Sequence, residues 1–205
     1  MASPTSPTSP TSLSGTPLGS APPPTPAHTV GPFFGYALPF PGGGQVAPQG
    51  HPDTIHLHGR VLDGAGEPVP DALLDFWQAA PDGSLAGAPG SMRRDPVTGG
   101  FPGRDGIGFT GFGRVATDAD GHYALHTLPP GRNAGPPYVS VCVFARGLLH
   151  HLFTRAYLAD GPDALLDALP AGRRATLIAS EEPHRVYRFD IRLQGEDETV
   201  FLEFP

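Results

Sequence analysis

The stretch PPYVSVCVFAR, residues 136–146, decides the fold. It follows a Gly-Pro turn signal, and its valines alternate strictly with other residues, a pattern that predicts a β-strand. Because successive side chains of a strand point to opposite faces, one face is apolar and the other is mixed. The mixed face is either the lining of a site or a half-buried wall. The apolar face holds Val139, Val141, Val143 and Ala145, and the mixed face holds Tyr138, Ser140, Cys142, Phe144 and Arg146.

Further alternating runs lie on both sides of this strand and are separated by turn signals. Gly and Pro make up about a quarter of the chain, with 28 and 27 residues. Several short strands at such spacing predict an all-β sandwich, with one or two helical turns over residues 163–169. We expect two of the strands to pair as a hairpin across the turn at 118–121. The predicted strands are 54–62, 72–78, 112–117, 122–127, 186–193 and 199–204.

The composition limits the partners of the chain. The formal net charge is −7, and all thirteen cationic residues are arginines that form no basic stripe, so we expect no nucleic-acid partner. One cysteine excludes an internal disulfide. No apolar run is long enough for a membrane span, and no signal peptide is evident. These features predict a soluble cytoplasmic protein without a membrane partner.

The first residues differ in composition from the rest. Residues 1–24 repeat Ser-Pro-Thr and contain few large apolar side chains, which predicts a disordered tail. Residues 25–205 are expected to form a single β-sandwich domain. It begins with an aromatic arm, residues 25–40, that packs either on its own domain or on a neighbouring subunit.

Two histidines on one predicted strand form the only motif with metal-ligand spacing. His56 and His58 share a face of the strand 54–62, and a His-x-His pair can bind a metal. No third ligand lies near them in the sequence. We therefore interpret them as solvent-facing residues, and keep an independent metalloenzyme as an alternative.

Several motifs together resemble the intradiol ring-cleavage dioxygenases, over about residues 25–205. The resemblance implies that family's β-sandwich fold. The motifs are GRVLDGAGEPVPDALLDFWQA at 59–79, TDADGHY at 117–123, TPAHTVGPF at 25–33, FARG at 144–147 and RFDIRLQGEDETVF at 188–201.

The resemblance also implies a ligand set that this chain lacks. Catalytic members hold Fe(III) through two tyrosinates and two histidines, and the histidine positions fall at Tyr138 and Ser140. One tyrosine position falls at Asn133, and the other lies within residues 80–117, which contain no tyrosine. The resemblance thus implies a non-catalytic alpha subunit. The iron would belong to a catalytic beta subunit, and the pair would cleave protocatechuate with O₂ to 3-carboxy-cis,cis-muconate.

The resemblance further implies that two parts of this chain contribute to the partner's substrate pocket at the subunit boundary. One is the arm, through Thr29, Gly31, Pro32 and Phe33, and Phe33 replaces a tyrosine that is frequent in relatives. The other is Arg146, which would favour an anionic substrate. The alternative to a pocket role is subunit packing for the arm and an ordinary ion pair for Arg146.

The remaining side chains that stand out have structural interpretations. Trp77 and Tyr123 are expected in the core or an interface, and Cys142 is expected to behave as a small buried hydrophobe. A β-sandwich binding or structural module without enzymatic activity is a further alternative for the whole chain.

Overall fold

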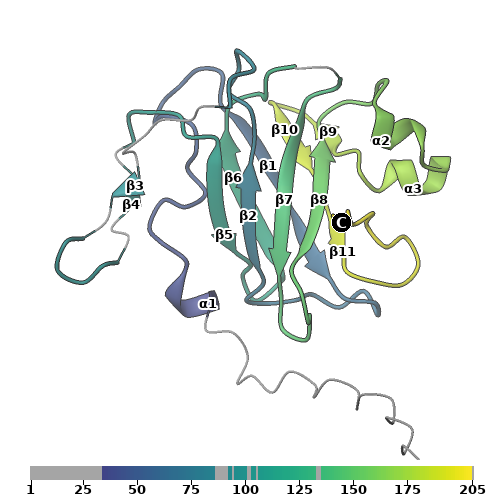
Figure 1. The fold of residues 1–205 in the computed structure, drawn as a ribbon, viewed down its shortest axis with the longest axis horizontal. Helices are drawn as coiled ribbons and strands as arrows, with labels where there is room; N and C mark the ends of the chain where they lie inside the picture. Colours follow the sequence, from purple (N-terminus) through teal and green to yellow (C-terminus); the bar gives the residue numbers. More distant parts are fainter. Residues whose placement is uncertain are drawn as a thin grey trace, which may run out of the picture.

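Two β-sheets packed face to face form the fold (Figure 1). The computed structural model describes residues 34–85, 92–93, 95–100, 103–104, 106–132 and 135–204. The predicted tail 1–24 and the arm as far as residue 33 lie outside these ranges. The all-β sandwich predicted from the sequence is confirmed.

The first sheet is built around β1, which pairs antiparallel with β6 on one edge and parallel with β10 and β11 on the other. β9 extends it beyond β10. Its strands are β1 (Ile55–Leu62), β6 (His122–Thr127), β9 (Ser180–Glu182), β10 (Val186–Arg188) and β11 (Ile191–Arg192).

The second sheet is antiparallel and has the order β5–β2–β7–β8. Short helices α2 and α3 lie beside its β8 edge (Figure 1). Its strands are β2 (Leu73–Trp77), β5 (Phe112–Ala116), β7 (Tyr138–Phe144) and β8 (Leu152–Tyr157). The other elements are α1 (Phe34–Ala37), β3 (Met92–Arg93), β4 (Gly103–Arg104), α2 (Ala164–Asp167) and α3 (Ala171–Ala175). The strand predicted over 199–204 is wrong, because within this range only Leu202 pairs, as an isolated bridge with Phe153.

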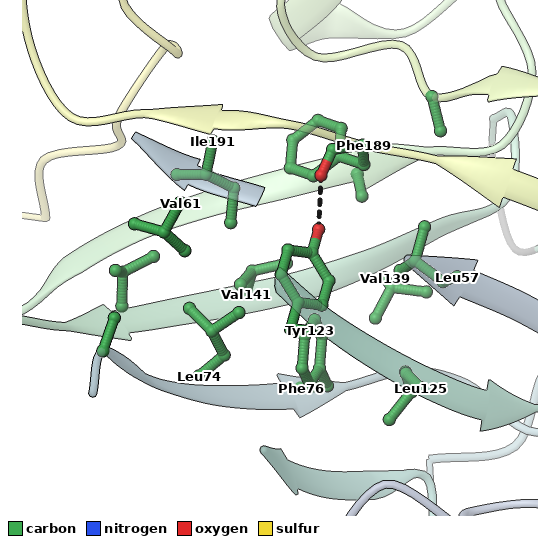
Figure 2. Packing of buried hydrophobic residues seen from close by; sticks show 14 of the residues in the cluster. Leu57, Val61, Leu74, Phe76, Tyr123, Leu125, Val139, Val141, Phe189 and Ile191 are labelled. Carbon is green, nitrogen blue, oxygen red and sulfur yellow. Dashed lines mark hydrogen bonds between the residues drawn. The ribbon is translucent and has the colours of Figure 1, made fainter. Parts of the chain in front are cut away.

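The alternation along β7 matches the sequence prediction. Its valines are at most 1% exposed and form the core together with residues from the first sheet, whereas the alternate side chains are half-buried on the outer face. Leu57 and Leu125 reach the same core from β1 and β6 (Figure 2). Removing these branched side chains from water drives the two sheets together.

A tyrosine hydrogen bond fixes the middle of the first sheet. The hydroxyl of Tyr123 donates to the carbonyl of Phe189 at 2.5 Å (Figure 2). Phe189 sits between β10 and β11, and its backbone crosses directly over Gly59 of β1, where a Cβ atom would collide with the same carbonyl oxygen. Burial raises the pKa of Tyr123 well above its usual value, so the buried hydroxyl keeps the proton that it donates.

The hairpin predicted for 112–117 and 122–127 is wrong in its pairing. β5 pairs with β2 in the second sheet, and β6 pairs with β1 in the first. The turn between them is present, with the Asp118 carboxylate accepting from the amides of Asp120 and His122. A turn sequence predicts a chain reversal but not the strand with which each arm pairs. The chain therefore passes from one sheet to the other at this turn.

The close approach at Gly59 gives a test of this architecture. We expect Gly59→Ala to lower the free energy of unfolding by about 3 kcal/mol or more, because the methyl group must displace the Phe189 backbone. Urea unfolding followed by tryptophan fluorescence measures the change. Gly172→Ala in α3 is the control, since its added Cβ meets nothing within 4 Å. An equal loss of stability in both variants would contradict the close approach.

Candidate functional site

The outer face of the second sheet carries a row of functional side chains across three strands. Ser140 of β7 lies opposite Trp77 of β2 on one side and Arg155 of β8 on the other. Trp77 is 42% exposed, so of its two expected positions the core is excluded and the interface stays a prediction. Strand alternation places Tyr138 on the same face, two residues before Ser140.

A cavity of about 210 Å³ opens beside this row. Its lining includes both Tyr138 and Ser140, the positions where the resemblance places histidine ligands, together with Trp77, Arg155 and Asp163. Asn133, where the resemblance places a tyrosine ligand, lies outside the described residues. The structure thus brings together the two described positions that the sequence singled out.

The groups in this cavity do not fit an iron ion. Arg155 lies over the Tyr138 ring, with its guanidinium carbon 4.4 Å from the ring centroid, so a fixed cation already occupies this side of the cavity. The other donor, the Ser140 hydroxyl, is a poor ligand compared with imidazole or a carboxylate. Within the part of the chain that the structure describes, no group of three His, Cys, Asp or Glu residues is placed to hold a metal ion.

Arg155 is held through a tyrosine and an aspartate that sequence reasoning missed. Its guanidinium donates to the Tyr157 hydroxyl at 3.1 Å, and that hydroxyl donates to Asp163 at 2.9 Å. Asp163 also accepts from the amides of Leu165 and Leu166 at the start of α2. Burial acts to raise the pKa of Asp163, but these hydrogen bonds outweigh it and the pKa is lowered, so the carboxylate is charged at neutral pH. The signal in the sequence was a single charged residue, Arg155, within the mostly apolar stretch 152–157.

A second hollow, of about 350 Å³, continues along the same face and shares Trp77, Ser140 and Arg155 with the first. Cys142 lies on its floor, half-buried, opposite Asp75 of β2. Asp75 receives two hydrogen bonds from Arg114, at 2.6 and 2.7 Å. Desolvation, and then the charge of Asp75, raise the pKa of the Cys142 thiol from 9.0 to about 11. The residue is therefore a neutral thiol at physiological pH.

Arg146 lies beyond the opposite end of β7 from Tyr138. Its side chain is 63% exposed and forms an ion pair with Asp71 at 3.2 Å. It lines neither of the two hollows described above. Any contact of Arg146 with a substrate would therefore be made outside this chain's own cavity.

The histidines of β1 form a surface cluster with those of β6. His56 packs edge-on against His126, with ring centroids 4.5 Å apart. His58 approaches His122 through Nδ1 at 3.3 Å and Glu182 through Nε2 at 3.2 Å. Because the two nitrogens of His58 point in different directions, His122 and Glu182 do not converge with it on one point.

Within the described residues, no helix combines the length and apolar character of a membrane span.

Comparisons with known proteins show which class of protein has this fold. A family model described as "Dioxygenase" matches residues 44–195. The solved dioxygenase domain of a carbohydrate-binding fusion protein from Streptomyces sp. SirexAA-E superposes with a TM-score of 0.51 at 29% identity, covering 84% of this chain and 99% of that one. Fold and sequence together define a dioxygenase-type β-sandwich.

Sequence identity to curated proteins shows to which family within this class the chain belongs. The chain is 41% identical over 202 residues to the protocatechuate 3,4-dioxygenase alpha chain of Burkholderia cepacia, covering 87% of this chain and 96% of the relative. It is 34% identical to the alpha chain of Pseudomonas putida, with 89% and 97% covered. The beta chain of Burkholderia cepacia is 31% identical, with 72% and 67% covered. The chain belongs to the intradiol dioxygenase family, and within it to the protocatechuate 3,4-dioxygenase alpha chains.

The raised pKa of Cys142 gives a test of the environment that the structure assigns to this thiol on the outer face of the second sheet. Below pH 9 we expect iodoacetamide to alkylate it about a hundredfold more slowly than a free cysteine, because only the thiolate reacts. The rate should keep rising about tenfold per pH unit toward pH 11. Mass spectrometry gives the rate directly, since this is the only cysteine in the chain.

Two controls accompany this measurement. The unfolded chain in urea should react as fast as a free cysteine. Asp75→Asn should speed the reaction of the folded chain, because the Asp75 charge raises the thiol pKa. A rate that levels off near pH 9 in the folded protein would contradict the structure.

Proposed function

We propose that this chain is the non-catalytic alpha subunit of an enzyme that opens the ring of protocatechuate with O₂, and that a catalytic beta subunit holds the Fe(III). The product is 3-carboxy-cis,cis-muconate, formed when the bond between the two hydroxyl-bearing carbons breaks and both atoms of O₂ enter the new carboxylates. The names of the relatives supply the activity. The division of roles between the subunits rests on the chain's own residues.

The observation that carries this division is the donor set at Tyr138 and Ser140. These positions supply no imidazole: one is a phenol whose ring lies under a guanidinium, and the other is a lone hydroxyl, which is a weak iron ligand. Both positions lie in a cavity with Arg155, a residue that repels a further cation. An iron-bearing partner with the missing ligands would complete the enzyme.

The contribution of this chain is to the partner's substrate pocket. We assign it to the arm residues Thr29, Gly31, Pro32 and Phe33 and to Arg146. The ion pair of Arg146 with Asp71 is solvent-exposed, and such pairs contribute little, so the guanidinium can exchange that partner for a substrate carboxylate. A positive charge at the pocket would favour protocatechuate over uncharged catechols.

Co-production with the beta subunit tests the assignment. We expect the purified pair to contain iron and to consume O₂ with protocatechuate, whereas the lone chain should contain less than about a tenth of an equivalent of iron and show no turnover. Elemental analysis and an oxygen electrode give the two readouts. Stoichiometric iron and turnover in the lone chain would refute the proposal.

Substitution of Arg146 tests the pocket assignment within the paired enzyme. We expect Arg146→Gln to raise KM for protocatechuate about tenfold with little change in kcat, because a charge-assisted contact to the substrate's carboxylate is lost in ground and transition state alike. Activity with catechol, which lacks the carboxylate, should be unaffected.

The matched control is Arg185→Gln, which removes an equally exposed arginine that pairs with Asp53 beside the other sheet. It should leave both substrates unchanged. An equal rise in KM for protocatechuate and catechol in Arg146→Gln would show a packing role and overturn the charge assignment.

A further inference from the structure

The cavity at Tyr138 and Ser140 has features that the proposed function does not use. Its volume of about 210 Å³ is small for a drug-sized ligand and suits a single ring. Trp77, Leu85 and Tyr138 supply apolar walls, and Ser140 and Arg155 supply polar groups. All of these residues belong to this chain, so the lining formed by the described residues uses neither iron nor a partner.

Arg155 enters this cavity with most of its donors unused. A guanidinium carries five N–H groups, and within the described part of the chain Arg155 makes its only hydrogen bond to Tyr157. It makes no ion pair with a described carboxylate. The Tyr138 ring beneath it and the Tyr157 hydroxyl beside it fix its plane. Such a half-buried, oriented fork matches the geometry of a carboxylate.

Asp163 is the one acidic residue in the lining, and its charge opposes an incoming anion. Its oxygen Oδ1, however, already accepts from the Tyr157 hydroxyl and from the backbone amides of Leu165 and Leu166. The Tyr157 hydroxyl stands between Asp163 and Arg155 in this chain of hydrogen bonds. Asp163 therefore orients the guanidinium through Tyr157 and leaves its remaining N–H groups to the cavity.

We propose that this cavity binds a single-ring aromatic carboxylate, with the carboxylate on Arg155 and the ring against Trp77 and Leu85. The Ser140 hydroxyl faces Arg155 across the sheet and has no hydrogen bond to the described residues, so it can donate to the second carboxylate oxygen. The apolar walls favour an aromatic acid over a phosphate, which would demand more donors. Every residue that this assignment uses belongs to this chain.

The test is a titration of the full-length chain with benzoate, which has the carboxylate and the ring but no hydroxyls to chelate a metal. Trp77 is the only tryptophan and lines the cavity, so its fluorescence reports the binding, and calorimetry gives the stoichiometry. We expect one benzoate per chain. Arg155→Met should weaken binding about tenfold to a hundredfold, as should replacing benzoate by benzamide.

Two variants serve as controls. Arg185→Met removes an arginine charge beside the other sheet and should leave the affinity unchanged. Arg155→Lys keeps the charge and loses the fork, and should bind more tightly than Arg155→Met but less tightly than the wild type. If Arg155→Met fails to fold, the benzamide comparison and Arg155→Lys still decide the question.

Absence of benzoate binding to the wild-type chain, equal affinity in Arg155→Met, or equal binding of benzamide would each overturn the proposal. In the complex with the beta subunit, equilibrium dialysis should show one fewer benzoate per pair after Arg155→Met. Failure of the paired enzyme to contain iron or to turn over would refute the proposed function and leave the titration of the lone chain unaffected. The two proposals can therefore fail separately.

Discussion

The alternation of side chains along β7 is the constraint on which the rest of the structure depends. One face of this strand supplies the valines that hold the two sheets together, and the other supplies Tyr138, Ser140 and Cys142 to the outer surface. A shift of one residue in its pairing would exchange the two faces, placing polar groups in the core and valines in the cavity. Core stability and the chemistry of the outer face are therefore fixed by the same register.

The first sheet needs a different stabilising interaction, because β1 pairs with two separate short strands along one edge. β10 and β11 are separated by Phe189 and Asp190, and this interruption leaves a backbone carbonyl inside the molecule. Tyr123 satisfies that carbonyl from β6, and Gly59 gives the backbone room to cross. An unpaired buried carbonyl would cost about 1–3 kcal/mol, so the tyrosine is a structural requirement of the interruption.

The sequence was sufficient for features that depend on one strand at a time. It predicted the two faces of β7 and the shared face of His56 and His58 on β1. It did not reveal that Arg155 lies beside Ser140, or that β5 and β6 lie in different sheets, because both depend on which strands become neighbours. Cross-strand contacts join residues far apart in the chain, and one sequence contains no record of them.

In the proposed acid site, the guanidinium of Arg155 supplies the positive charge that a metal ion could otherwise supply. Both a metal ion and a guanidinium are cations that attract carboxylates. A guanidinium, however, binds only through N–H donors, has no exchangeable coordination position and takes no part in electron transfer. Arg155 can therefore orient an aromatic acid against Trp77 but cannot activate its ring toward O₂. In the proposed site, Tyr138 and Ser140 beside a fixed arginine thus provide for binding of an acid without catalysis.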